Sequence, residues 1–521
     1  MESKLPDHES ATTSVLDPLL RHNYFPTQRR LREEIAPLLS SVTFAPEVAR
    51  SLDVQKLTEN RKRSGFDVLP YRISRANGLS RWCGVPHPLG YSKLVIAIDN
   101  NWKELSKRIQ SENSQIQPSK HPDGRMFAFD YEQSTDRDES DWGRSFGSSV
   151  IASADIANFY DTLYSHSIPW AIAGMSEAKR QRSKSLWFNQ LDESVTRCQR
   201  NETLGLPVGP GTSNIFAELI LARVDSDLRS KNFRFVRYVD DYTCWCNDES
   251  EARRFLSELE GSLNAYRLRL NGRKSRIQAL PVPSPNWWVS ELNLFAPIKG
   301  ANHARLGAHA INRALKLAGE CPDGAVMKYA LRMVASIEDA DFFDGRTVTQ
   351  VLSLAFHDST LMPAIQPYIE KAALFGQSHY QEQLLALTAR HAERRYSDAV
   401  CWGLYLLARL AIEPTNALID QVLAMDDPIS IACLLQIGNR RCATRIVDHC
   451  SHIDQSDIYA LDRNWVLLYQ LFARDDIPNP YKNEKTFDTL RDNAVNFLTP
   501  VKLLCDDFDD DRTLAVSRDP G

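Results

Sequence analysis

A pair of adjacent aspartates inside an apolar stretch constrains the fold of this chain most strongly. The segment FRFVRYVDDYTCWC, residues 233–246, places Asp240 and Asp241 between two runs of apolar and aromatic residues. Such runs on either side of a short polar pair are typical of two antiparallel strands joined by a tight turn. We therefore expect a β-hairpin with both carboxylates at its tip. An exposed Asp-Asp turn without a function is the alternative interpretation of this segment taken alone.

A third carboxylate lies upstream, where another strand should end. The segment VIASADIANFYDTLYSHSIPWAI, residues 150–172, begins with a short β-prone run that finishes at Asp155 and continues in a helical pattern. Three carboxylates that meet repel one another unless cations lie between them, and two metal ions about 4 Å apart serve phosphoryl transfer in this way. Because Mg²⁺ prefers oxygen ligands, the sequence predicts a Mg²⁺ centre at Asp155, Asp240 and Asp241, with Mn²⁺ as an alternative ion.

Two further segments carry candidate ligand-binding residues. Residues 205–225, GLPVGPGTSNIFAELILARVD, combine a Gly-Pro loop with an amphipathic helix. Glycine lets a backbone approach a ligand closely, and a helix N-terminus favours phosphate, so Gly209 and Ser213 are candidates for nucleotide binding. Residues 268–277, LRLNGRKSRI, form a turn with Lys274, which could act as a general acid toward pyrophosphate. A solvated loop lysine is the alternative.

The pattern of apolar residues divides the chain into several parts. A length of 521 residues exceeds what one compact core holds. We expect an N-terminal arm at 1–45, a mixed unit at 46–300, a helical unit at 301–505 and an acidic disordered tail at 506–521. Segments of the helical unit, such as AVCWGLYLLARLAI, carry apolar residues at helical spacing between short breaks. This pattern favours stacked helical hairpins of the HEAT-like kind.

Composition excludes several other classes of protein. The chain is 43% hydrophobic and 25% charged, as folded soluble proteins are, and it has no apolar run of the length that spans a membrane. Its ten cysteines show no paired spacing, which indicates reduced thiols of a cytoplasmic protein and not a disulfide framework. The net charge of −5 argues against a uniformly basic surface but is compatible with a basic channel for nucleic acid.

The order of these segments resembles the reverse transcriptases over residues 70–295. The resemblance rests on four motifs in the family's order: motif A with Asp155, Phe159 and Tyr160, motif B with Gly205, Pro207, Gly209 and Ser213, motif C with Tyr238, Val239, Asp240 and Asp241, and motif D with Lys274. It implies an α+β fold with the fingers and palm of a right-hand polymerase, followed here by the all-α unit. It also implies dNTPs as substrates and a DNA product.

The same resemblance implies roles for further residues. The main-chain carbonyl of Ile156 would join the three carboxylates as a metal ligand. Tyr160 would be the steric gate that excludes a ribose 2′-hydroxyl. Residues 71–88 resemble the fingers segment that places an arginine on the triphosphate, with Arg81 as the first candidate and Arg72 as the second.

Within the family, the motifs resemble those of bacterial abortive-infection and defence-associated reverse transcriptases. These pair a polymerase core with C-terminal helical repeats, which implies antiphage defence and a homo-oligomer. Some members need a noncoding RNA or a second reverse transcriptase, and some synthesise DNA without a conventional template or start it on a protein hydroxyl. Val208 stands where many reverse transcriptases have glutamine, and valine cannot hydrogen-bond a nucleotide. We therefore expect non-standard templating or protein priming.

Two other functions compete with this one. A retron- or intron-like reverse transcriptase would copy a dedicated RNA. A catalytically silent scaffold would bind nucleic acid mainly through its helical unit. The three intact carboxylates argue against the scaffold, because a degenerate palm has no reason to keep mutually repelling acids.

Overall fold

The computed structural model describes residues 14–26, 35–75, 78–119, 121–127, 142–283, 286–296, 303–322, 325–336, 345–374, 376 and 378–504. The predicted acidic tail at 506–521 lies outside this range, as do parts of the predicted arm. In the described part of the chain, no helix has the length and apolar character needed to cross a bilayer.

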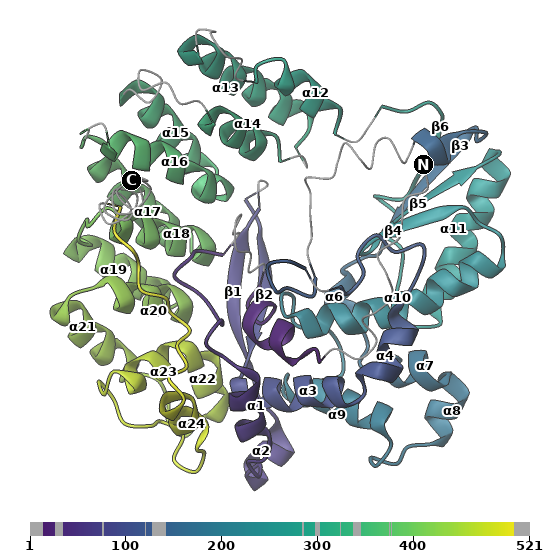
Figure 1. Ribbon diagram of the computed structural model, residues 1–521, viewed down its shortest axis with the longest axis horizontal. Coiled ribbons are helices and arrows are strands. Elements are labelled where there is room, and N and C mark those ends of the chain that lie inside the picture. The colour runs from purple at the N-terminus through teal and green to yellow at the C-terminus, as the bar shows by residue number, and fades with distance from the viewer. Residues whose placement is uncertain are drawn as a thin grey trace, which may run out of the picture.

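A four-stranded antiparallel sheet forms one end of the molecule (Figure 1). Its strands are β3 (Val150–Asp155), β4 (Phe235–Tyr238), β5 (Asp241–Cys246) and β6 (Arg276–Ala279), in the order β4-β5-β3-β6. β4 and β5 form the hairpin expected from the 233–246 segment. In the pairing of β3 with β5, Asp155 lies opposite Asp241. The expected strand end and the expected hairpin tip thus lie side by side.

Two helices pack against this sheet and against each other. They are α10 (Gly211–Ser230) and α11 (Glu249–Asn264). α11 is amphipathic and buries Phe255 and Leu259 under the sheet. α10 is buried on nearly all sides, so even its acidic Glu218 and Asp225 are inside the protein. The loop before this helix is held by backbone hydrogen bonds from Gly84 to Val208 and from Leu206 to Tyr160.

A second, two-stranded sheet lies at the centre of the view in Figure 1. It consists of β1 (Val68–Ser74) and β2 (Ser80–Pro86). The helices around it and below it are α1 (Pro46–Asp53), α2 (Glu59–Ser64), α3 (Pro88–Asn100), α4 (Trp102–Ile109), α6 (Phe159–Thr162), α7 (Ser167–Ala173), α8 (Met175–Arg180) and α9 (Trp187–Arg197). The N-terminal residues pack into the same core, where the Tyr24 hydroxyl donates to the Pro86 carbonyl.

The remaining elements of the described residues, from 287 onward, are helices. They are α12 (Trp287–Asn293), α13 (His303–Glu320), α14 (Val326–Ala335), α15 (Gly345–His357), η3 (Ser359–Leu361), α16 (Met362–Leu374), α17 (Tyr380–Glu393), α18 (Ser397–Arg409), α19 (Asn416–Met425), α20 (Pro428–Ile437), α21 (Arg440–Cys450), α22 (Ile458–Arg463), α23 (Trp465–Ala473) and α24 (Thr486–Asp492). Neighbours along the chain pack together, such as α13 with α14 and α17 with α18. The described residues between 303 and 492 therefore form the expected all-helical part, while its assignment as HEAT-like stays a prediction.

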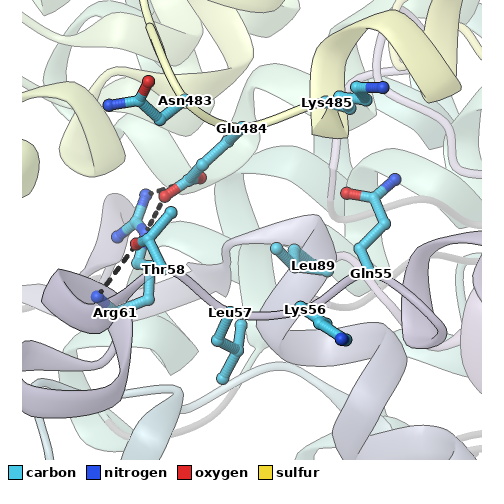
Figure 2. A pocket seen from close by; sticks show the side chains of 9 residues that line it. All are labelled: Gln55, Lys56, Leu57, Thr58, Arg61, Leu89, Asn483, Glu484 and Lys485. Carbon is cyan, nitrogen blue, oxygen red and sulfur yellow. Dashed lines mark hydrogen bonds and ion pairs between the residues drawn. The ribbon is translucent and has the colours of Figure 1, made fainter.

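This helical part runs in an arc from the four-stranded sheet back to the N-terminal helices (Figure 1). Its far end is fixed by Arg61 of α2, which is fully buried and donates to both Asp462, at 2.6 and 2.8 Å, and Glu484, at 2.6 Å. A cavity of about 260 Å³ lies at this seam, and Figure 2 shows Arg61 and Glu484 in its wall. The buried ion pairs make the arc part of one continuous structure with the N-terminal elements.

Candidate active site

The three predicted carboxylates lie at the same end of the two central strands of the four-stranded sheet. Asp155 is the last residue of β3, Asp241 is the first residue of β5, and the two are partners in the strand pairing. Asp240 lies in the turn between β4 and β5, and its carbonyl accepts the Ile156 N–H at 3.3 Å. The turn places Val239 at a φ of 55°, an unfavourable conformation for a β-branched residue. Surrounding contacts must therefore hold it in this conformation.

A buried arginine supplies such contacts. Arg237 is fully buried and donates to the Val239 carbonyl at 2.8 Å. It also forms ion pairs with Glu218 at 2.8 Å and Asp225 at 2.9 Å, both on α10. Tyr242 donates to Asp225 at 3.0 Å. This network ties the carboxylate hairpin to α10. Arg237 was not among the residues predicted from the sequence, although an arginine that alternates with apolar residues in a strand was the available signal.

The carboxylates repel one another electrostatically. The pKa of Asp240 is raised by withdrawal from water and by the negative charge of Asp155. Withdrawal from water and the charges of Asp240 and Asp155 raise the pKa of Asp241 to about 6. The positive charge of Lys274 lowers the pKa values of both Asp240 and Asp241. Because neighbouring negative charges disfavour ionisation of a carboxyl group, this end of the two central strands attracts cations.

Lys274 lies at the carboxylates, and its role as a general acid stays a prediction. Its Nζ is 2.9 Å from Oδ2 of Asp155, and this contact raises the pKa of Lys274. Asn271, which the sequence analysis missed, donates its side-chain amide to Oδ1 of Asp155 at 3.0 Å. The backbone N–H of Asn271 also donates to the Asp155 carbonyl at 2.7 Å. The turn at 271–275 therefore orients Asp155 and holds an ammonium group beside it.

The carboxylate oxygens at this end of the strands are suitable ligands for a hard divalent cation. Carboxylate oxygens are the ligands that such ions prefer, and the repulsion that raises the pKa values of Asp240 and Asp241 is what a bound cation would relieve. In their present positions, no three His, Cys, Asp or Glu side chains of the described residues are gathered closely enough to hold an ion. Each side-chain oxygen of Asp155 accepts one hydrogen bond, from Asn271 or Lys274, and a carboxylate oxygen keeps a further lone pair for a cation.

Tyr160 lies near Asp240, in the short helix α6 that follows β3. Its hydroxyl donates to Oδ1 of Asn214, in the first turn of α10, at 2.5 Å. Withdrawal from water and the charge of Asp240 raise the pKa of Tyr160, so the hydroxyl stays neutral. The carbonyl of Tyr160 accepts the Leu206 N–H at 2.8 Å. These two hydrogen bonds join Tyr160 of motif A to Asn214 of α10 and to Leu206 of the motif B loop.

Gly209 and Ser213 have packing roles that the sequence did not reveal. Gly209 has a φ of 125°, and a Cβ placed there would lie 2.6 Å from Cγ of Pro26. The Ser213 hydroxyl is buried and donates to the Pro207 carbonyl at 2.7 Å. The close approach that makes glycine necessary is therefore to Pro26, a residue of the same chain. Their predicted contact with nucleotide stays a prediction.

The two candidate arginines lie in different surroundings. The positive charge of Arg81, on β2, lowers the pKa values of Asp240 and Tyr160, so Arg81 belongs to the neighbourhood of the carboxylates. Arg72 stacks on Trp82 at 4.2 Å and donates to the Arg395 carbonyl of the helical part at 3.5 Å. Arg75, which the sequence analysis did not select, has its pKa lowered by withdrawal from water and by the charge of Arg81. Of the two candidates, Arg81 is thus the one near the carboxylates, and Arg75 lies near Arg81.

Comparison with known proteins bears directly on this site. Residues 94–294 match the family model described as reverse transcriptase (RNA-dependent DNA polymerase), a domain type that generally uses divalent metal ions. This range contains all three carboxylates and Lys274. No curated protein matches the chain.

Solved structures of telomerase from Candida tropicalis are similar over part of their length. One contains a fragment of telomeric RNA, with 11% identity, a TM-score of 0.32, and coverage of 68% of this chain and 65% of that chain. The other is apo telomerase, with 10% identity, a TM-score of 0.32, and coverage of 78% and 69%. The present chain thus spans less than two thirds of the first of them. Residues 94–294, which hold the carboxylates and Lys274, are thus similar to reverse transcriptase domains.

Proposed function

We propose that this chain is a magnesium-dependent DNA polymerase of the reverse-transcriptase type that acts in antiphage defence, with non-standard templating or protein priming. The observation that carries the polymerase proposal is the pairing of Asp155 with Asp241 at the ends of β3 and β5. Asp240 precedes Asp241 in the chain, and Lys274 contacts Asp155. The defence role is supported by the resemblance of the motifs and by the helical part, which we propose to be HEAT-like. The same resemblance suggests a homo-oligomer and a noncoding RNA or second reverse transcriptase as partners.

Each residue of the site has a definite part in the proposed reaction. Asp155, Asp240, Asp241 and the Ile156 carbonyl would hold the metal ions. When bound, such ions neutralise the triphosphate and lower the pKa of the attacking hydroxyl. Arg81 attracts the triphosphate by charge. Lys274, whose pKa is raised, keeps a proton at Nζ for the departing pyrophosphate.

Val208 supports the non-standard use of a template. Its backbone carbonyl accepts the Gly84 N–H of β2 at 3.0 Å, and its side chain packs partly buried against the core. The valine side chain has no amide group that could hydrogen-bond an incoming nucleotide or its template base. Base-pair geometry is therefore checked less closely at this position than in enzymes with glutamine.

Sequencing of the DNA product tests the proposed function. Purified full-length protein with Mg²⁺ and all four dNTPs is expected to yield a homopolymer, a simple repeat or random DNA, with nucleotide attached to a protein hydroxyl where priming is internal. DNA complementary to a co-purified RNA would instead support the retron- or intron-like alternative. Protein that binds nucleic acid but incorporates no nucleotide with any primer would support the silent scaffold.

Tyr160 gives a specific prediction about sugar selection. Replacing Tyr160 by alanine removes the ring that Asn214 holds in place, so a ribose 2′-hydroxyl can enter. The ratio of ribonucleotide to deoxyribonucleotide incorporation should rise by about 10- to 100-fold. Tyr160→Phe is the matched control, because it loses only the bond to Asn214 and should retain most of the preference for dNTPs. An unchanged ratio in Tyr160→Ala would show that another group excludes the 2′-hydroxyl.

A further inference from the structure

Among the residues that the structure describes, β1 pairs only with β2, so its other edge has no neighbouring strand. Backbone N–H groups on such an edge need acceptors when they are buried. Here the first two residues of α18, Ser397 and Asp398, provide them. The Arg72 N–H donates to the Ser397 hydroxyl at 3.3 Å, and the Ser74 N–H donates to Oδ2 of Asp398 at 2.9 Å. The helical part therefore closes the free edge of β1.

The contact between Asp398 and Ser74 is the strongest of these. The Ser74 hydroxyl donates to Oδ1 of Asp398 at 2.7 Å, so both carboxylate oxygens bind the same residue. Both side chains are buried. Burial raises the pKa of Asp398 to about 6, and the bonds from Ser74 oppose this rise. Because a buried carboxylate is costly without such partners, the contact fixes one geometry of strand and helix.

Further bonds support the same contact on either side. Tyr396 donates its hydroxyl to the Gly78 carbonyl in the turn between β1 and β2, at 2.9 Å. The Ser397 hydroxyl donates to Asp427 at 2.8 Å, and Asp427 also accepts the Ser430 N–H at the start of α20. The start of α18 is thus held by α20 while it holds the hairpin.

The hairpin also reaches the candidate active site. Ser74 pairs with Ser80, and the adjacent pair is Ile73 with Arg81. The charge of Arg81 acts on Asp240 and Tyr160. Figure 1 shows β1 and β2 between the helical part and the elements that carry the carboxylates. Displacement of Ser74 would therefore displace Arg81 with respect to Asp240 and Tyr160.

We propose that Asp398 is a positioning residue for the polymerase: by holding Ser74, the helical part sets the place of Arg81 at the triphosphate of the incoming nucleotide. This inference rests on the proposed function. It makes the helical part a component of nucleotide binding and not a separate appendage.

Steady-state kinetics of Asp398→Ala test the proposal. We expect the KM for dNTP to rise about tenfold, the effect of losing roughly one good hydrogen bond, while kcat at saturating dNTP changes less than about twofold. Asp398→Asn should restore a KM near that of the wild type, since its Oδ1 can accept the Ser74 N–H while its amide donates to the Ser74 hydroxyl. Ser74→Ala removes only one of the two bonds and should raise the KM about threefold, which keeps the test decisive if Asp398→Ala does not fold.

Asp358 provides a matched control within the helical part. It accepts the Thr360 N–H at 3.0 Å and the Thr360 hydroxyl at 2.7 Å at the start of η3, so it makes the same two bonds without involving the hairpin. Asp358→Ala should leave the KM unchanged. Hydrogen exchange adds a readout independent of activity, because the Ser74 amide should exchange about tenfold faster in Asp398→Ala and at the wild-type rate in Asp358→Ala.

The outcomes separate this inference from the proposed function. An active wild type whose KM is unaffected by Asp398→Ala, or equally affected by Asp358→Ala, overturns the positioning role alone. A parallel fall in kcat with no rise in KM also overturns it. A wild type that incorporates no dNTP under any condition overturns the proposed function and the positioning role together.

Discussion

Asparagine in place of both Asp240 and Asp241 is expected to lower dNTP incorporation by at least about 10³-fold, since stabilisation of transition-state charge is the largest single contribution to such catalysis. The substitution keeps the shape of the hairpin and removes two of the three carboxylates that would hold the metal ions. Incorporation of a labelled dNTP into acid-insoluble product, measured with Mg²⁺, gives the rate. Protection against phage should be lost in parallel if synthesis is the basis of defence.

A stability measurement distinguishes this loss from misfolding. The pKa of Asp241 in the folded chain is about 6, against an ordinary value of 3.8. The folded state therefore binds the proton more tightly than the unfolded state, and the ionised carboxylate lowers stability as pH rises through this interval. The double variant should accordingly melt no lower than the wild type at pH 7 in EDTA. A clear fall in Tm would attribute the loss of activity to damage of the fold.

A neighbouring carboxylate serves as the matched control for activity. Asp248 caps α11 by accepting the Glu251 N–H at 2.8 Å and takes no part in the site. Asparagine is also a good capping residue, so Asp248→Asn should leave the rate of dNTP incorporation within about twofold of the wild-type rate. A similar loss in both variants would contradict a specific role for the pair at 240 and 241.

The largest expected effect on stability lies directly beneath the site. Replacing Arg237 by methionine leaves Glu218 and Asp225 buried without their cation and leaves the Val239 carbonyl without a donor. Breaking a buried ion pair by removing one partner costs about 3–5 kcal/mol. Denaturant unfolding, followed by far-UV circular dichroism, should show a loss of this size in the unit that contains the four-stranded sheet.

An exposed ion pair supplies the comparison for this variant. Arg253 and Glu249 pair on the surface of α11. Exposed pairs of this kind contribute about 0.5 kcal/mol or less, so Arg253→Met should be nearly neutral. Adding Glu218→Gln and Asp225→Asn to Arg237→Met should recover part of the lost stability, because the uncompensated charges are then gone. Equal effects of the Arg237 and Arg253 substitutions would contradict the structural role assigned to the buried network.

The parts of the site that are local in sequence were predictable from it. The β4–β5 hairpin follows from the alternation of apolar residues around Asp240, and the end of β3 at Asp155 follows from the change to a helical pattern. The alignment of Asp155 with Asp241 depends on long-range strand pairing, which no local pattern determines. The order of the motifs, through the family resemblance, was what brought these segments together.

Other features depend on packing that the sequence does not display. Arg72 and Arg81 occupy the same short segment, and only the surroundings of the finished hairpin separate them, with Arg72 against Trp82 and Arg395. The close approach of Gly209 to Pro26 could not be read from the sequence, and the predicted contact of Gly209 with nucleotide stays a prediction. The bond from Ser74 to Asp398 joins residues 324 positions apart. Contacts of this kind follow from tertiary arrangement, so neither residue type nor spacing predicts them.

Incorporation of labelled dNTP by purified, full-length wild-type protein tests the central claim most directly. The measurement compares Mg²⁺ with EDTA and dNTPs with rNTPs, both without added nucleic acid and with a panel of primers and templates. We predict acid-insoluble DNA that requires Mg²⁺ and dNTPs and is absent with EDTA. No incorporation across the whole panel, or incorporation that persists in EDTA, would contradict the assignment of Asp155, Asp240 and Asp241 as the metal-binding centre of a DNA polymerase.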